Sequence, residues 1–307
     1  MNANKLILGT AQLGLNYGIA NKTGKPTKGE SFNIMKLAVE SGISYFDTAY
    51  SYGDSEIVIG KFFESYGEYR DKVNIITKMP SFGGRIITEK LINKYFFESL
   101  GRLNKESVYC YMIHDFNDII NNSDIIGKVF LSLKKKGFIK KIGVSVYNNS
   151  QIKYLLENFE FDLIQLPINI FDQRLVVSSI LHDLKKKGIE IHARSVFLQG
   201  LIFLDNKNSL PLSLSRAMPY IKKLEKISSQ LDMTKEEIAL LFVNSINEID
   251  KIVVGVEKIE QLRRNIDTLN KVRIFEKSKD SIHFDSFFIR DEDIVNPTKW
   301  GVVHGNF

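Results

Sequence analysis

Strand-like and helix-like segments alternate along most of the chain, and this alternation is the feature that most limits its fold. Short apolar runs end in polar residues, and each is followed by a segment whose apolar residues recur near a helical period. The strands expected on this basis span residues 6–9, 43–47, 73–78, 108–114, 139–145, 163–166, 189–193 and 252–254. The expected helices span residues 31–40, 56–63, 88–100, 124–136, 150–158, 175–187 and 259–269.

Eight strands joined by helices predict an α/β fold, a closed (β/α)8 TIM barrel that forms a single domain over residues 1–307. Such a barrel typically takes about 250 residues. The chain has 307 residues, of which 44% are hydrophobic, and this is enough for one large core. A doubly wound open sheet is the alternative. It is less favoured because the chemically interesting residues follow several successive strands, whereas an open sheet gathers them at one switch point.

The longest interruption of the alternation lies between the last two strands. Residues 197–215 contain Gly, Asn, Asp and Pro and are expected to form a long loop. Two helices are expected after it, at 216–231 and 234–243, and the second is opened by a capping-box sequence, Thr234-Lys235-Glu236-Glu237. A variable C-terminal tail is expected over residues 271–307, with aromatic residues that fit either a pocket lining or ordinary core anchors.

Three successive strands are expected to end in side chains with proton chemistry. Asp47, Lys78 and His114 close the second, third and fourth apolar runs, and Tyr52 lies in the loop after the first of these. Parallel strands in a barrel bring such ends to one rim. An ammonium near a phenol eases proton donation by the phenol, a carboxylate holds the ammonium, and a neutral imidazole can orient a carbonyl oxygen. Taken alone, residues 46–56 fit a plain strand–turn–helix junction equally well.

Residues 47–56 match the pattern D-T-A-x-x-Y-G-x-S-E of the aldo-keto reductase superfamily at every fixed position. The chain resembles this superfamily from about residue 9 to residue 265. The resemblance implies a catalytic tetrad of Asp47, Tyr52, Lys78 and His114, in which Lys78 lowers the pKa of Tyr52 and Tyr52 acts as general acid. It further implies the NAD(P)H-dependent reduction of an aldehyde or ketone. The loops that would select the small-molecule substrate carry no recognisable motif, and a sugar or sugar-nucleotide carbonyl is the suggested class.

The usual dinucleotide fingerprint, G-x-G-x-x-G after a first strand, is absent. The resembling family instead binds nicotinamide cofactors across the carboxyl end of its barrel. Two positions depart from its pattern, because Val146 stands where Asn is common and Arg194 stands where an aromatic residue usually stacks on the nicotinamide. The resemblance implies cofactor contacts by Gly9, Thr10, Ser145, Gln165, Arg194, Ser195, Phe197, Gln199, Gly200, Gly255, Lys258, Gln261 and Asn265.

The charges after the last strand leave the form of the coenzyme open. Lys258 can pair with the 2′-phosphate of NADP, whereas Glu257 would repel that phosphate or accept a hydrogen bond from the free ribose hydroxyl of NAD. The resembling family commonly uses NADP, so NADP is the expected coenzyme and NAD is the alternative. A planar guanidinium at Arg194 can stack on a ring, but it would disfavour the cationic oxidised cofactor.

Composition narrows the remaining function classes. The net charge is +6 and the pI is about 9.1. Two of the three lysine runs directly precede glycines and fit helix ends, so nucleic-acid binding is not expected. No apolar run is long enough to span a membrane, and no signal peptide is expected before the first strand. The single cysteine, Cys110, fits a reducing cytoplasm. No metal site is expected, and the protein is expected to be a monomer or a weak homo-oligomer.

Two further functions stay open. An NAD-dependent aldose dehydrogenase, which would run in the oxidative direction, draws support from Glu257. A non-catalytic, cofactor-sensing regulatory subunit could use the same scaffold, although the complete tetrad argues against it.

Overall fold

The computed structural model describes residues 2–204, 210–272 and 282–300. Parts of the expected barrel domain 1–307, the loop 197–215 and the tail 271–307 therefore lie outside the described residues, at Met1, 205–209, 273–281 and 301–307.

Eight parallel strands form a closed barrel, in which each strand pairs with the next along the chain and the last pairs with the first. Closure confirms the barrel that the alternation of the sequence predicts and excludes an open sheet. The strands are β1 Leu6–Gly9, β2 Tyr45–Asp47, β3 Asn74–Met79, β4 Val108–Ile113, β5 Ile139–Ser145, β6 Leu163–Pro167, β7 Glu190–Arg194 and β8 Lys251–Gly255.

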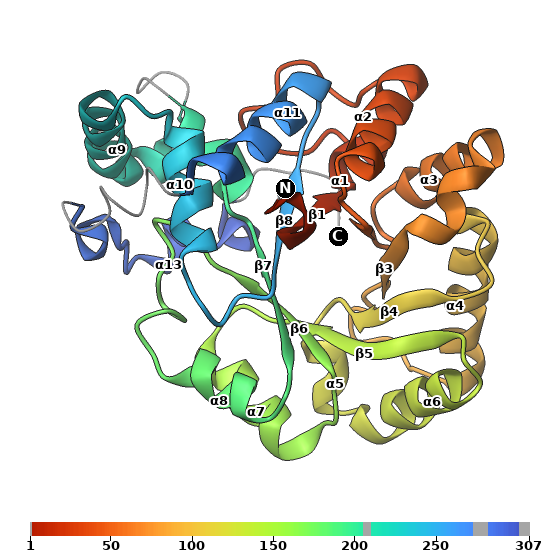
Figure 1. Ribbon diagram of the computed structural model, residues 1–307. Helices are drawn as coiled ribbons and strands as arrows, with labels where there is room; N and C mark the ends of the chain where they lie inside the picture. The colour runs from red at the N-terminus through yellow and green to blue at the C-terminus, as the bar shows by residue number, and fades with distance from the viewer. Residues whose placement is uncertain (1, 205–209, 273–281, 301–307) are drawn as a thin grey trace.

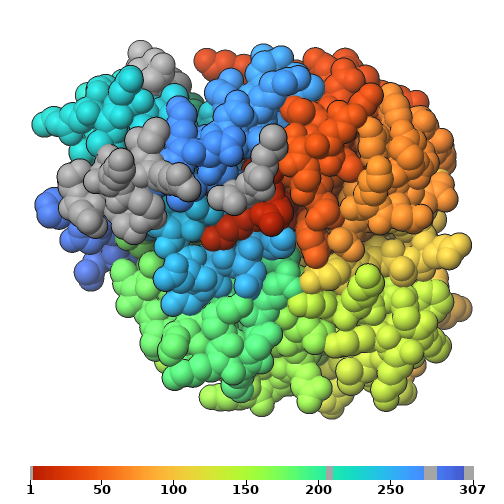
Figure 2. Space-filling view, in the orientation of Figure 1, coloured from red at the N-terminus to blue at the C-terminus, as the bar shows by residue number. Residues whose placement is uncertain are grey.

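Helices cover the outside of the barrel, and the chain passes round it once (Figure 1). Figure 2 shows the same path on the surface, where the colours follow one another in a ring around the short helix η1 (Asn2–Lys5). The longer helices are α2 Lys28–Glu40, α3 Ser55–Ser65, α4 Glu89–Leu103, α6 Ser123–Lys135, α7 Asn149–Asn158, α8 Ile180–Lys186, α9 Met218–Leu231, α10 Lys235–Asn244 and α11 Ile259–Thr268.

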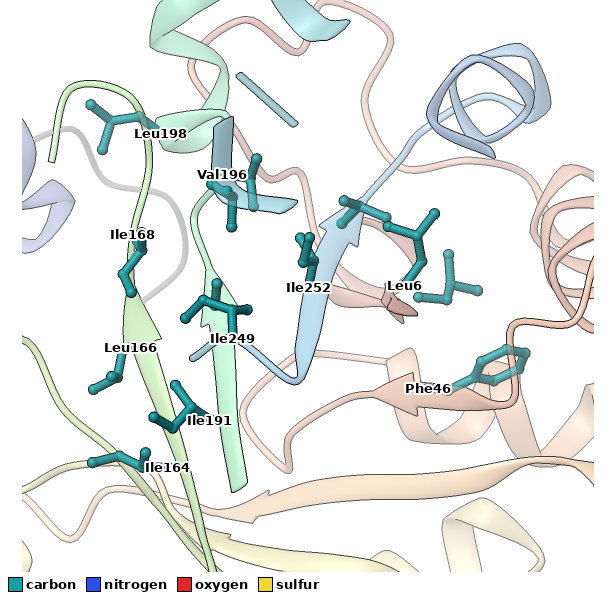
Figure 3. Close-up of a cluster of buried hydrophobic side chains, with 14 of the residues drawn as sticks. Leu6, Phe46, Ile164, Leu166, Ile168, Ile191, Val196, Leu198, Ile249 and Ile252 are labelled. Atoms are coloured by element: carbon teal, nitrogen blue, oxygen red, sulfur yellow. The ribbon is translucent and has the colours of Figure 1, made fainter. Parts of the chain in front are cut away.

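Successive strand residues point to opposite faces, so the barrel has an outer and an inner core. The outer core lies between strands and helices and holds most of the buried apolar side chains, including those labelled in Figure 3 from β1, β2, β6, β7 and β8. A separate inner cluster contains Ile7, Ile76, Cys110, Met112 and Leu163. Gly143 belongs to this layer as well, since an added Cβ would lie 2.5 Å from Met112 Cγ.

The inner cluster positions the candidate site through the two-residue period of the strands. The residues that share its face lie two positions further along each strand, towards the carboxyl rim. These residues are Gly9 after Ile7, Lys78 after Ile76, His114 after Met112 and Gln165 after Leu163.

Helix α8 begins later than the sequence predicts. A helix was expected from Leu175 to Lys187, but α8 runs only from Ile180 to Lys186. The residues before it include two valines and two serines, which are poor helix formers, and the Ser178 hydroxyl donates to the carbonyl of Leu175 at 2.9 Å instead. The expected loop 197–215 also contains short 3-10 helices, η3 Leu198–Phe203 and the start of η5 Leu212–Ala217.

Helix α10 starts with the capping box that its sequence predicts. The Glu237 backbone N–H donates to the Thr234 hydroxyl at 3.1 Å, and the Thr234 backbone N–H donates to the Glu237 carboxylate at 2.8 Å. The box fixes the first turn of α10, which carries Glu236.

The described part of the tail, residues 282–300, is attached to the connection between β6 and α8. It contains η8 Phe284–Phe287, α13 Glu292–Val295 and η9 Pro297–Lys299. Arg174 forms two hydrogen bonds of 2.8 Å with Asp172 and a third of 2.8 Å with Glu292 of the tail. The Ile289 backbone N–H also donates to the carbonyl of Phe171 at 2.9 Å. The indole of Trp300 is buried and donates to the carbonyl of Ile294 at 3.0 Å.

Candidate active site

A buried ion pair lies at the carboxyl ends of β2 and β3. The Lys78 ammonium donates to both carboxylate oxygens of Asp47, at 2.9 and 2.8 Å, and to the carbonyl of Thr48 at 2.9 Å. The side chains of Lys78 and Asp47 are only 1% and 5% exposed. The three donor sites of the ammonium are therefore matched by three acceptors, which fixes the position of its charge.

Tyr52 and His114 lie beside this ion pair. The Lys78 ammonium is 5.0 Å from the centre of the Tyr52 ring, and the rings of Tyr52 and His114 are 5.7 Å apart in an edge-to-face arrangement. The structure thus brings together the four side chains of the expected tetrad, which come from three successive strand ends.

The loop that carries Tyr52 is packed tightly against the short helix α1 (Ala11–Gly14). A Cβ added to Gly14 would lie 1.9 Å from the carbonyl oxygen of Tyr52. Gly53 has a positive φ of 54° and approaches the carbonyl of Gly14. The Thr10 hydroxyl donates to the carbonyl of Asp47 at 2.8 Å. These contacts hold the phenol against the barrel rim.

The electrostatic environment keeps His114 and Tyr52 neutral. Burial, with help from the positive charges of Lys78 and Arg194, lowers the pKa of His114 from 6.5 to about 3. Burial raises the pKa of Tyr52, the Asp47 carboxylate raises it further, and Arg194 lowers it. The net direction is opposite to the one expected from Lys78, because loss of solvent and the carboxylate outweigh nearby positive charge. Burial also lowers the pKa of Lys78, while Asp47 raises it.

A cavity of about 900 Å³ extends from these four residues to α10 and α11. Most of the expected cofactor contacts line it, and two do not. Lys258 is exposed at the start of α11. Gln165 is buried and donates to the Asp47 carboxylate at 2.5 Å. The expected residues that line the cavity are Gly9, Thr10, Ser145, Arg194, Ser195, Phe197, Gln199, Gly200, Gly255, Gln261 and Asn265.

Two buried amides have polar atoms without a hydrogen-bond partner among the described residues. Both side-chain polar atoms of Asn265 lack a partner although the residue is fully buried, and Asn265 lines the cavity. The Gln165 carbonyl oxygen is also without a partner. Buried polar atoms are normally paired, so the unpaired amide of Asn265 suits a ligand that places a polar group at the α11 end of the cavity. A nicotinamide dinucleotide has such a group, and its length suits a cavity that runs from the tetrad to α11.

The sequence reasoning missed several residues of the cavity. Tyr17 accepts a hydrogen bond of 3.1 Å from Gln199, and Tyr147 packs on Arg194, whose guanidinium lies 4.3 Å from its ring centre. At the far end, Arg264 pairs with the largely buried Glu236 at 3.0 Å. These partners are distant in sequence, and no local pattern marks them. Other missed lining residues include Gln12, Asn21, Phe203, Pro297 and Thr298. Glu257, which the sequence placed near the cofactor, also lines the cavity.

Neither a membrane helix nor a metal cluster occurs in the part of the chain that the structure describes. None of its helices has the length and hydrophobicity needed to cross a bilayer. Its His, Cys, Asp and Glu side chains form no group of three or more suited to a metal ion. Cys110 is buried in the inner layer of the barrel, where burial raises its thiol pKa.

Comparison with known proteins agrees with this architecture over nearly the whole chain. The model of the Aldo/keto reductase family matches residues 5–282. An uncharacterized oxidoreductase of Bacillus subtilis, YqkF, is 27% identical over 290 residues, which cover 88% of this chain and 92% of that protein. The NADH-specific methylglyoxal reductase of Escherichia coli is 23% identical over 270 residues, which cover 75% of this chain and 79% of that protein.

A solved structure shares the fold. The aldo-keto reductase AKR11C1 of Bacillus halodurans, in its holo form, superposes with a TM-score of 0.68 at 21% identity, covering 89% of this chain and 91% of that chain.

Proposed function

Because this chain belongs to the aldo/keto reductase family and is an oxidoreductase, we propose that it reduces an aldehyde or ketone with a nicotinamide cofactor, with Tyr52 as general acid. The observation that carries the proposal is the position of the Tyr52 phenol between a buried ammonium and a neutral imidazole, on the wall of a large cavity. A bound reduced nicotinamide would supply the hydride.

Tyr52 has the properties that a proton donor needs in this reaction. The phenol enters the reaction protonated, and because its pKa is raised, the phenolate has to be stabilised as the proton leaves. As negative charge develops on the carbonyl oxygen of the substrate, Tyr52 gives that oxygen its proton and becomes a phenolate. The Lys78 ammonium, 5.0 Å from the ring centre and itself buried, stabilises this phenolate.

Asp47 and His114 would prepare the site for that proton transfer. Asp47 holds Lys78 in place through two hydrogen bonds. With a pKa of about 3, His114 stays neutral and can donate an N–H hydrogen bond to the substrate carbonyl. Ser145 and Gln165 would bind the amide of the cofactor, and Gln261 and Asn265 would bind its other end.

We propose NADP as the preferred coenzyme. The net charge of +6 attracts the form with the additional phosphate, and Arg264 and Lys258 lie at and beside the far end of the cavity. Glu257 also lines that end and opposes a phosphate there. It therefore keeps NAD as the alternative, and with it the second candidate function, an NAD-dependent aldose dehydrogenase.

The proposed substrate is a small polar carbonyl compound, and a sugar or sugar-nucleotide carbonyl is the leading class. Support comes from the polar side chains of Asn21 and Thr298 on the cavity wall. Relatives of the chain are named a methylglyoxal reductase and an L-glyceraldehyde 3-phosphate reductase, which also points to small oxygenated substrates. The protein is expected to act in the cytoplasm, as a monomer or weak homo-oligomer.

Replacing the phenol tests the proposal directly. Tyr52→Phe should reduce turnover by about a thousandfold, the range of general acid catalysis, because the proton donor is lost. Cofactor binding should be retained. Fluorescence titration with NADPH and NADH would identify the coenzyme, and a panel of aldehydes, ketones and aldoses would then be assayed with it.

Tyr50→Phe is the matched control for this variant. Tyr50 belongs to the same loop, but its hydroxyl donates to Glu98 and it does not line the cavity, so turnover should be largely kept. If Tyr52→Phe kept most of the wild-type turnover, Tyr52 could not be the general acid. Tight cofactor binding with no carbonyl reduced by the wild type would favour a regulatory subunit that senses the cofactor.

A further inference from the structure

Arg194 places a guanidinium in the cavity wall at the carboxyl end of β7. The guanidinium lies 4.3 Å from the centre of the Tyr147 ring. It donates to the Ser195 hydroxyl and to the carbonyl of Val146, both at 3.3 Å. All of these partners are neutral, so they orient the guanidinium without cancelling its charge.

The other charged side chains of the cavity are mostly paired. The Lys78 ammonium is 2.8 Å from the Asp47 carboxylate, and Arg264 is 3.0 Å from the Glu236 carboxylate. Arg194, in contrast, forms no ion pair with any described residue. Its charge acts on the tetrad, since it lowers the pKa values of His114 and Tyr52. The tetrad end of the cavity therefore carries one uncompensated positive charge.

We propose that Arg194 makes this enzyme bind the reduced cofactor in preference to the oxidised one. The inference rests on the proposed function, in which the nicotinamide lies at the tetrad end. The nicotinamide ring is positively charged when oxidised and neutral when reduced, while the rest of the molecule has the same charge in both forms. Arg194 and the oxidised ring therefore repel each other, and Arg194 and the reduced ring do not.

The size of the effect follows from the partial burial of the site. At an effective dielectric constant near 20, the repulsion between two like charges several ångströms apart weakens binding by well over a factor of ten. Where water enters the site, the repulsion is smaller. We expect a preference of about tenfold for the reduced form. Arg194 thereby weakens the hold of the enzyme on the oxidised product and favours its release. The enzyme is thus suited to reduction, and poorly suited to the oxidative direction of an aldose dehydrogenase.

Cofactor affinities test the inference without reference to catalysis. Dissociation constants for the oxidised and reduced forms of the preferred coenzyme would be measured by calorimetry for the wild type, Arg194→Met and Arg194→Lys. We expect the reduced form to bind the wild type about tenfold more tightly. Arg194→Met should lower this ratio at least threefold, mainly by tightening the oxidised form, and Arg194→Lys should keep most of it because the charge remains.

Arg264→Met is the matched control, because it removes the other arginine of the same cavity. Arg264 lies on α11, at the end away from the tetrad, where both cofactor forms carry the same charge. Both affinities should change by the same factor and their ratio should stay constant. Equal binding of the two forms to the wild type, or an unchanged ratio in Arg194→Met, would overturn the inference alone. Failure of the wild type to bind either form would overturn the proposed function and the inference with it.

Discussion

Individual side chains at the site have pKa values that differ from those of the same groups in water. His114 is the clearest case, because burial and two neighbouring cations lower its pKa from 6.5 to about 3. Between these two pH values, the unfolded chain binds a proton at His114 and the folded chain does not. The folded state therefore loses stability as the pH falls through this window.

This difference predicts how one substitution changes the pH dependence of unfolding. In His114→Gln, the free energy of unfolding should fall less steeply between pH 6.5 and 3 than in the wild type. One proton accounts for a slope of at most about 1.4 kcal/mol per pH unit. Urea unfolding over this range would measure the difference. A slope in His114→Gln equal to that of the wild type would contradict the lowered pKa of the buried imidazole.

Site residues at strand ends, and the pairing of Asp47 with Lys78, could be predicted from the sequence, whereas contacts with residues outside the tetrad could not. Asp47 and Lys78 each close a short apolar run, so their place at the rim follows from local pattern and barrel geometry. The contact between Gln165 and Asp47 joins residues 118 positions apart, and no local signal announces it. The direction of the Tyr52 pKa was also beyond sequence reasoning, because it depends on how much water the folded chain removes from the phenol.

Among the secondary-structure elements, α10 connects local stability with the far end of the cavity. Its capping box holds the first turn, and Glu236 in that turn pairs with Arg264 of α11 at 3.0 Å. Loss of the cap would loosen the turn and with it this ion pair.

The cap predicts a paired effect on stability and binding. Thr234→Ala should lower the free energy of unfolding by about 1 kcal/mol, the usual value of an N-cap, and should weaken the affinity for both cofactor forms alike. Thr27→Ala removes the capping box of α2 and should cost a similar amount of stability with cofactor affinity unchanged. Thermal unfolding and cofactor titration would separate the two. A loss of affinity in Thr27→Ala as large as in Thr234→Ala would contradict the expected link.

Most elements could be predicted because their signals are local, as the capping-box sequence of α10 illustrates. The predicted start of α8 was wrong. The helical spacing of apolar residues extends back to Leu175, but the helix itself begins only at Ile180. The chain just before that stretch is held by contacts with the tail, such as the hydrogen bond from the Ile289 N–H to the carbonyl of Phe171. A prediction from the local pattern gives no weight to such distant contacts.

Across the whole molecule, Arg174 joins the tail to the barrel. It is the positive centre of a group with Asp172, which is only 1% exposed, and Glu292 of the tail. Two residues of the same tail, Pro297 and Thr298, line the main cavity. The attachment of the tail therefore bears on the shape of the cavity.

Breaking this attachment should be costly because it leaves a buried charge behind. Arg174→Met should lower the free energy of unfolding by about 3 kcal/mol, since Asp172 would lose its partner. The double variant Asp172→Asn with Arg174→Met should recover much of the loss. Arg216→Met is the control, because Arg216 also contacts the tail, through Asp291, but is 65% exposed and should cost less than about 1 kcal/mol. Urea unfolding of the wild type and these three variants would measure the free energies of unfolding. Equal losses in Arg174→Met and Arg216→Met would contradict the role of burial.

Part of the cavity wall comes from segments outside the eight strands. Phe203 comes from the excursion after β7, and Pro297 and Thr298 come from the tail, whereas Asp47 and Lys78 are embedded in the barrel itself. Exchange of these peripheral segments can therefore change which ligands the cavity admits, while the residues at the strand ends stay the same. An engineer who wants a new substrate should graft at these two segments and leave the strands untouched.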